Sequence, residues 1–200
     1  MTRRLDVDAR KEQLAEAVWQ VILDRGISAV SVRSVADQAG VVVGSLRHVF
    51  PTRAELMQFS SELMLRRATE RVLAVSSTDD PEQYALNVIE QLLPLSADSR
   101  AEMEVNLALA AEAAALPELV AIKDEAHRQL QEVMLRLVEL LSGCSRESTD
   151  MRASAQRLHV LIDGIAFHLV HRSPDEDPGW ALDIMRAEVS TIHARCETQR

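Results

Sequence analysis

Three polar side chains that can donate hydrogen bonds lie close together in the first quarter of the chain: Ser45, Arg47 and His48. An arginine guanidinium can donate two hydrogen bonds to O6 and N7 of guanine, and serine and histidine can bond to base edges or to phosphate. Polar residues on the exposed face of a short helix are equally compatible with plain solvation. This cluster alone therefore leaves nucleic-acid recognition and solvation both open.

Two short helices joined by a tight turn are expected to position this cluster. Ser31 can cap a helix of about two turns that ends at Gly40. A second short helix follows over about 42–49, in which Leu46 and Val49 can pack inward while the polar cluster faces outward. This is helix-turn-helix geometry, in which the second helix enters the major groove of DNA.

The flanking helices are also marked in the sequence. Apolar residues at helical spacing, followed by Gly26, predict a helix over about 9–25. Phe50-Pro51 ends the second short helix, because a proline disfavours helix in the residue before it. Thr52-Arg53-Ala54-Glu55 then has the pattern of a capping box and opens a long helix to about residue 75.

The rest of the chain alternates helical segments with breaks. Asp80 is expected to cap a helix that has Pro81 at its first position. The expected helices cover about 81–93, 97–115, 118–141, 147–171 and 178–197. No stretch shows convincing strand alternation. The sequence therefore predicts an all-α protein of about nine helices.

Composition and charge fit this organisation. The chain has 200 residues, 47% of them apolar, with only 6 Gly and 6 Pro, which favours helix. The net charge of −9 is unevenly distributed. Residues 1–55 hold 8 basic and 7 acidic side chains, and the remainder holds 14 basic and 24 acidic ones. The N-terminal part is thus compatible with DNA, while the acidic remainder would stay away from phosphates.

No segment is apolar and long enough to span a membrane, and the N-terminus does not have the pattern of a signal peptide. We therefore expect a cytoplasmic protein with no membrane partner. Cys144 and Cys196 are far apart in sequence and form no CxxC pair, so two unpaired thiols are expected.

The residues from Gly26 to Leu56 resemble the head of the tetracycline-repressor (TetR) family. The resemblance rests on Ser31-Val32, Ala39-Gly40-Val41, Gly44-Ser45-Leu46 and Glu55-Leu56, at the family's spacing. It implies a three-helix DNA-binding head at 1–55 and a helical body at 56–200 that binds a ligand and dimerises. It also implies a regulator, most simply a repressor that binds a palindromic operator as a dimer and is released by a small molecule.

The family's DNA-contacting roles carry over to eight positions of this sequence. Ser31, Arg33, Thr52 and Arg53 would approach phosphates, while Val43, Ser45, Arg47 and His48 belong to the helix that reads the bases. This sequence departs from the family at three positions. Val42 replaces the usual Ser or Thr cap, Arg47 replaces a common tyrosine, and Val43 replaces a polar residue, where it could instead touch a thymine methyl group.

The body resembles the choline-sensing (BetI-type) repressors over residues 100–109 and 161–168. This resemblance implies that the last two helices pair with their mates in a homodimer. Gly164 and Ala166 would allow close approach there, and apolar contact could come from Ile162, Leu169, Ile184 and Val189. Burial between helices of the same chain would equally account for these side chains, so the sequence leaves open which of them face a partner.

The same resemblance implies a ligand pocket in the body. The candidate lining residues, all of which could equally be ordinary core, are Met64, Tyr84, Met103, Asn106, Met134 and Phe167. Choline would require an aromatic cage, but the aromatic residues outside the head are only Phe59, Tyr84, Phe167 and Trp180. A modest apolar or amphiphilic molecule fits this sequence better.

The residues also allow two other functions. A metal-dependent enzyme would use His159, Asp163, His168 and His171 on one predicted helix, but the chain lacks the phosphate-loop, Gly-x-Ser-x-Gly and HExxH motifs. A helical interaction protein that does not bind DNA is supported only by the acidic net charge. The sequence thus favours a regulator that is not an enzyme and has no metal or cofactor.

Overall fold

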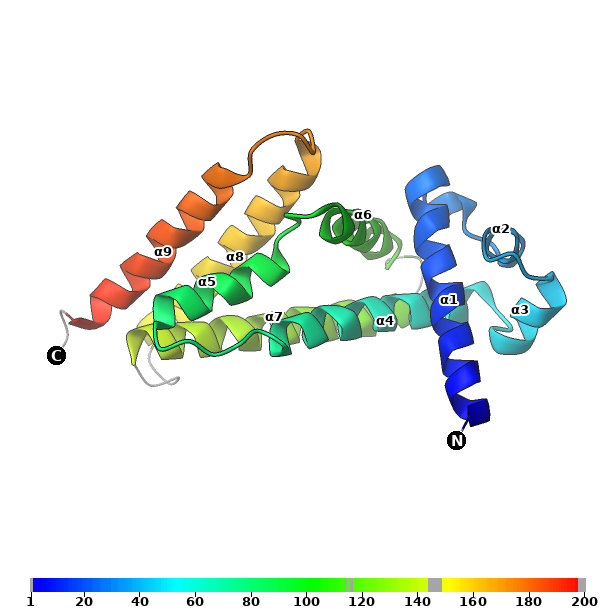
Figure 1. Ribbon diagram of the computed structural model, residues 1–200, viewed down its shortest axis with the longest axis horizontal. Helices are drawn as coiled ribbons and strands as arrows, with labels where there is room; N and C mark the ends of the chain where they lie inside the picture. Colours follow the sequence, from blue (N-terminus) through cyan, green and yellow to red (C-terminus); the bar gives the residue numbers. More distant parts are fainter. Residues whose placement is uncertain (1, 114, 116, 144–148, 198–200) are drawn as a thin grey trace. The chain divides into compact units, whose positions relative to one another are not determined.

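The computed structural model describes residues 2–113, 115, 117–143 and 149–197, and within these ranges it contains nine α-helices and no strand (Figure 1). The helices are α1 (Thr2–Arg25), α2 (Val32–Gln38), α3 (Val43–Val49), α4 (Arg53–Leu73), α5 (Pro81–Leu92), α6 (Ala97–Glu112), α7 (Pro117–Ser142), α8 (Thr149–His171) and α9 (Gly179–Glu197), with one 3-10 turn, η1 (Ile27–Ala29). The all-α prediction of about nine helices is confirmed.

The predicted helix boundaries agree with the structure within three residues, with one exception. α1 begins seven residues before the expected start at Ala9. Asp8 and Ala9 are exposed, so the first turns of this helix show no apolar periodicity from which its start could be predicted.

The chain forms two compact units. The first comprises residues 1–67 and 101–125, and the second comprises residues 68–100 and 126–200. The boundary predicted between head and body, after residue 55, falls inside the first unit. The head is thus packed together with the start of α4 and with residues from α6 and α7.

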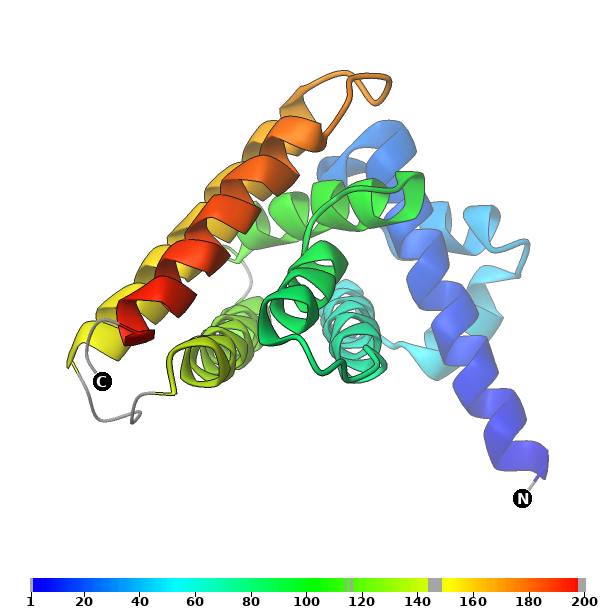
Figure 2. The same ribbon diagram turned by 60° about the vertical axis from the view of Figure 1, so that its left-hand side comes forward.

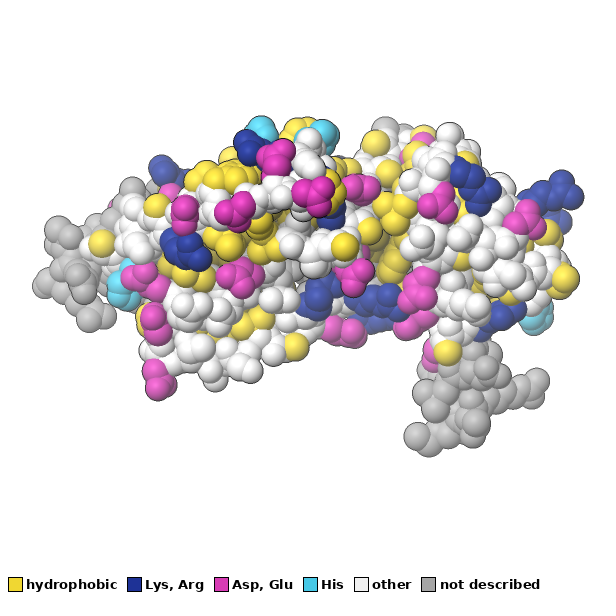
Figure 3. Space-filling model, turned by 45° about the horizontal axis from the view of Figure 1, so that its top comes forward, with side chains coloured by type: hydrophobic (Ala, Val, Ile, Leu, Met, Phe, Trp, Pro, Cys, Tyr) yellow, Lys and Arg dark blue, Asp and Glu magenta, His cyan; other side chains and the backbone are white. Residues whose placement is uncertain are grey.

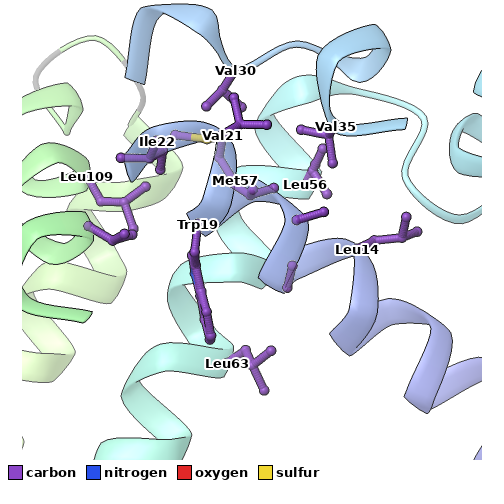
Figure 4. Packing of buried hydrophobic residues seen from close by; sticks show 14 of the residues in the cluster. Leu14, Trp19, Val21, Ile22, Val30, Val35, Leu56, Met57, Leu63 and Leu109 are labelled. Atoms are coloured by element: carbon purple, nitrogen blue, oxygen red, sulfur yellow. The ribbon is translucent and has the colours of Figure 1, made fainter. Parts of the chain in front are cut away.

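The core of the first unit lies between four helices, α1, α2, α3 and the first part of α4, and Leu109 of α6 also belongs to it (Figure 4). Leu14, Val35, Leu46 and Leu56 come from these four helices and have no exposed surface. Each fully buried Val or Leu side chain contributes about 1.5–3 kcal/mol to folding. This contact set fixes the two short helices on a frame that they are too short to provide alone.

Several helix ends are set by the residues that the sequence marked. The Asp80 carboxylate accepts hydrogen bonds from the backbone N–H groups of Glu82 (2.9 Å) and Gln83 (3.3 Å), as predicted for the start of α5. Gly26 follows α1 with φ +78°, a left-handed conformation that favours glycine. These ends are local in origin, which is why the sequence predicts them.

The second unit is built on α5, α8 and α9, and Figure 2 shows α8 and α9 side by side and antiparallel. Four of the residues expected to offer contact to a partner lie instead inside this unit, with exposed fractions of 6% or less: Ile162, Ala166, Leu169 and Val189. Their apolar character serves packing between helices of the same chain. Gly164 and Ile184 are exposed, so they remain available to a partner.

The C-terminal end of α8 is held by the side chain of Arg100. Its guanidinium donates hydrogen bonds to the backbone carbonyls of Leu169 (2.8 Å), Val170 and Arg172. The last carbonyls of a helix have no partners within the helix and carry partial negative charge, so a cation there is stabilising. Arg100 thereby fixes the start of α6 to the end of α8.

Among the described helices, none is long and apolar enough to cross a membrane. The expectation of two unpaired thiols cannot be followed into the fold, because Cys144 and the side chain of Cys196 lie outside the described residues.

Candidate nucleic-acid interface

The turn between α2 and α3 is fixed by hydrogen bonds to the last turn of α2. Gly40 has φ +67°, its N–H donates to the Asp37 carbonyl (3.2 Å), and the N–H of Val41 donates to the Ala36 carbonyl (2.9 Å). This pair of bonds is a Schellman motif, which requires a left-handed residue and therefore favours glycine. The predicted tight turn is confirmed, and it fixes the angle between the two short helices.

The start of α2 is fixed by a reciprocal cap. The Ser31 hydroxyl accepts from the Ser34 N–H (3.0 Å), and the Ser34 hydroxyl accepts from the Ser31 N–H (2.9 Å). The Ser34 hydroxyl also bonds to the Ala29 carbonyl (2.7 Å). Ser31 and Arg33 are exposed, so the structure leaves both accessible to a phosphate.

Helix α3 divides into an anchoring face and an exposed face. Leu46 is fully buried, and Val43 and Val49 are half-buried against the core of the first unit. Arg47 and His48 are exposed on the opposite side, and Ser45 is half-buried at its flank. The predicted inward packing of Leu46 and Val49 is confirmed. In Figure 3, dark blue basic side chains and a cyan histidine are visible on the surface of the helix-turn-helix, at the right of the view.

The glycine in the first turn of α3 leaves a gap on the exposed face. Gly44 lies one helical turn before Arg47 and His48, at positions i+3 and i+4. A Cβ atom built on Gly44 would meet no heavy atom within 4 Å. None of the described residues therefore requires a glycine here, although glycine weakens a helix relative to alanine.

Arg53 has a structural role that the sequence did not predict. Its Nε donates to the Val30 carbonyl (2.9 Å), and its Nη2 donates to the Ile27 carbonyl (3.4 Å) and lies 3.8 Å from the Glu112 carboxylate. Arg53 thus ties the start of α4 to the segment that precedes α2. The expected phosphate contact of Arg53 stays a prediction, and it competes with these internal partners.

The start of α4 carries one half of the expected capping box, because the Thr52 side chain caps the Glu55 N–H while the Glu55 carboxylate bonds to the Thr52 hydroxyl. The Thr52 hydroxyl accepts from the Glu55 N–H (3.1 Å) and donates to the Glu55 carboxylate (3.2 Å). Thr52 is exposed, so its hydroxyl lies at an accessible helix N-terminus.

The six candidate pocket residues are divided between the two units. Met64, Met103 and Asn106 belong to the first unit and Tyr84, Met134 and Phe167 to the second. Met64 and Met134 are buried, Tyr84 and Met103 are half-buried, and Asn106 and Phe167 are exposed. Their role in ligand binding stays a prediction.

The histidines considered for metal binding have other surroundings. His159 is buried, its Nε2 lies 3.5 Å from the Asp163 carboxylate, and its ring stacks on His127 with centroids 4.8 Å apart. Burial lowers the pKa of His159, the nearby Asp163 carboxylate partly opposes this shift, and neighbouring His127 acts in the same direction as burial. His171 bonds to the Phe167 carbonyl (2.8 Å). Among the described residues, no three His, Cys, Asp or Glu side chains gather in a group that could hold a metal ion.

Comparisons with known proteins agree with this geometry. Residues 14–58 match the family of bacterial regulatory proteins called the tetR family, and residues 81–194 match the BetI-type transcriptional repressor C-terminal family. The chain is 33% identical to the HTH-type transcriptional regulator PksA of Bacillus subtilis over 171 residues, which is 84% of this chain and 82% of that protein.

Solved structures show the same architecture. A transcriptional regulator from Rhodococcus sp. Rha1 aligns with a TM-score of 0.80 and 25% identity, covering 91% of this chain and 95% of that one. A transcriptional regulator from Saccharomonospora viridis, solved in complex with choline, aligns with a TM-score of 0.75 and 20% identity, covering 92% and 95%. The second likeness concerns the fold alone.

Proposed function

Because this chain belongs to the TetR family and is a DNA-binding transcriptional regulator rather than an enzyme, we propose that it represses its target genes by binding a palindromic operator as a dimer. One observation carries this proposal: α3 is anchored by Leu46 while it exposes Arg47 and His48. An anchored helix with an exposed polar face can enter the major groove without losing its own packing.

Specificity and affinity come from different residues of the head. Ser45, Arg47 and His48 would contact base edges, where a bidentate arginine–guanine pair discriminates by about 1–3 kcal/mol. Ser31, Arg33 and Thr52 would contact phosphates, which fix the register of the protein on the duplex without reading sequence. We propose residues 1–55 as the DNA-binding domain and residues 56–200 as the ligand-binding and dimerisation domain, with residues 56–67 and 101–125 packed in the same compact unit as the head.

Dimerisation uses the exposed faces of α8 and α9. Val160 is 60% exposed, Phe167 50% and Ile184 42%, which is unusual for such large apolar side chains along two adjacent helices. Gly164 lies between Val160 and Phe167 on α8, and a Cβ atom there would meet nothing within 4 Å. A small residue between two apolar ones allows the helix of a second copy to approach closely. A two-fold dimer presents two reading helices, as a palindrome requires.

The effector is a small apolar or amphiphilic molecule that binds the body and releases the operator. Binding shifts the population only if the ligand prefers the state that does not bind DNA. A quaternary ammonium would need free aromatic faces. However, three of the four aromatic residues outside the head already have ring or cation partners: Phe59 packs on Phe50, Phe167 stacks on His171, and Arg172 covers Trp180 at 4.8 Å. The protein acts in the cytoplasm, where it reaches chromosomal DNA directly.

Selection from random duplex DNA tests the proposal. The full chain should enrich a two-fold-symmetric sequence whose half-sites are centred about 10 base pairs, or a multiple of that, apart. Sedimentation of the complex should give two chains per duplex. Enrichment of an asymmetric single half-site, or of no sequence, would contradict the proposal.

A further inference from the structure

The most exposed large apolar side chain among the described residues stands at the start of the reading helix. Val42 is 75% exposed and is the N-cap residue of α3, with an extended backbone (φ −73°, ψ 141°). Its carbonyl accepts from the N–H groups of Ser45 (2.9 Å) and Leu46 (3.3 Å). The backbone of Val42 is therefore fixed by the helix, while its side chain points to solvent.

Valine is a poor choice at this position for the folded chain alone. N-cap positions favour Ser, Thr, Asp or Asn, whose side chains accept hydrogen bonds from the first free N–H groups. Val42 makes no such bond. The position thus lacks a side-chain cap and also exposes apolar surface to water.

The neighbouring valine has the opposite surroundings. Val43 is half-buried and packs against the core of the first unit together with Val49. The sequence alone suggests Val43 as a contact for a thymine methyl group. The packing makes Val43 part of the anchor of α3 and leaves Val42 free.

We propose that Val42, rather than Val43, recognises a thymine in each half-site through the C5-methyl group in the major groove. The inference rests on the proposed function, because it requires α3 to lie in the groove. Residues at the N-terminal end of a recognition helix contact base edges, and the thymine methyl group is the one apolar feature of the major groove. Gly44, which lacks a side chain two residues later, leaves room for this close approach.

The test uses the operator selected from random DNA, with each thymine replaced in turn by deoxyuridine, which removes only the methyl group. Burying one methyl group contributes about fourfold to affinity. At one thymine position of the operator, replacing thymine by deoxyuridine in both half-sites should therefore weaken binding of the wild-type chain about 15-fold. Val42→Ala should weaken binding to the thymine operator and lose the response to deoxyuridine at that position.

Three further variants separate recognition from folding. Val42→Ser supplies the missing cap, so it should raise the melting temperature while it loses the thymine preference. Val43→Ala should keep the response to deoxyuridine, and so should Leu73→Ala, which removes a comparably exposed (74%) apolar side chain from α4.

The outcomes distinguish this inference from the proposed function. If the wild-type chain enriches a palindrome, but Val42→Ala responds to deoxyuridine as the wild type does, the assignment of Val42 is wrong while the operator proposal stands. If the wild type enriches no sequence, both are overturned.

Discussion

Gly44 and Gly164 allow the two proposed interfaces to be tested separately by the same small change. Both are helical glycines at which an added Cβ atom would meet no heavy atom within 4 Å inside the chain. Gly44 lies on the exposed face of α3, and Gly164 lies on the exposed face of α8. Alanine at either position should therefore not disturb the fold of the isolated chain. It should weaken only the complex with DNA (Gly44) or the dimer (Gly164).

Gly44→Ala should have two opposite effects: it should stabilise the folded chain and weaken its binding to the operator. Replacing glycine by alanine in a helix stabilises by about 0.5–1 kcal/mol, and in the first turn we take the lower value, ~0.5 kcal/mol. For a chain of this size that raises the melting temperature by about 1–2 °C. On DNA, an extra methyl group in a close-packed contact costs about 1–3 kcal/mol. Two half-sites double this cost, so operator affinity should fall at least about 30-fold.

Thermal unfolding and operator titration of the same preparation measure both parts. Gly164→Ala is the reciprocal control, because it should weaken dimer association in sedimentation experiments and leave the affinity of the assembled dimer for DNA unchanged. Wild-type operator affinity for Gly44→Ala would refute the reasoning, because the exposed face of α3 would then not lie against the groove.

Three further predictions follow from the packing. Arg53→Ala removes two hydrogen bonds to backbone carbonyls and should lower the free energy of urea unfolding by about 1–3 kcal/mol. A decrease of less than ~0.5 kcal/mol would show that Arg53 does not stabilise the start of α4. The double variant Val160→Glu/Ile184→Glu should sediment as a monomer and keep the helicity of the wild type. A dimer that persists would show that the interface does not include these two residues. The lowered pKa of buried His159 means that the unfolded state binds a proton more readily, so stability should fall as pH decreases below about 6.5. His159→Gln should reduce the dependence of the unfolding free energy on pH between pH 7.5 and 5.5. An unchanged dependence would show that other groups cause it.

Features set by local sequence were predictable here. The Asp80 cap, the left-handed Gly26 and Gly40 and the cap at Ser31 each depend on residues within a few positions of one another. The helix-turn-helix therefore follows from its own short segment of sequence. Its polar cluster could be assigned to an exposed face because Leu46 marks the buried one.

Features set by packing between distant residues were not predictable. Arg53 meets carbonyls 23 and 26 residues earlier in the chain, and His127 stacks on a histidine 32 residues later. No periodicity links such positions. The choice between Val42 and Val43 on the exposed side depends on how α3 is rotated against its neighbours, and apolar type alone cannot decide it.

The packing of α8 shows the same limit. Ile162 and Leu169 are apolar, as expected of residues in a dimer interface, but they lie inside the second unit. A helix that packs within its chain and also faces a partner carries two apolar stripes, and the sequence does not show which stripe is which. Exposure in the folded chain separates the two stripes: Val160 is 60% exposed and Phe167 50%, and the proposed dimer would use these side chains.

The most direct test of the central claim is a titration of the selected operator and a scrambled duplex with three proteins. These are the wild type, the Arg47→Ala/His48→Ala variant and Arg136→Ala, an exposed arginine on α7 that serves as the matched control. Wild type and control should prefer the operator by about 1,000-fold or more. The double variant should lose most of this preference and bind both duplexes with weak, salt-dependent affinity. A double variant that keeps the operator preference would contradict the claim that α3 reads the DNA.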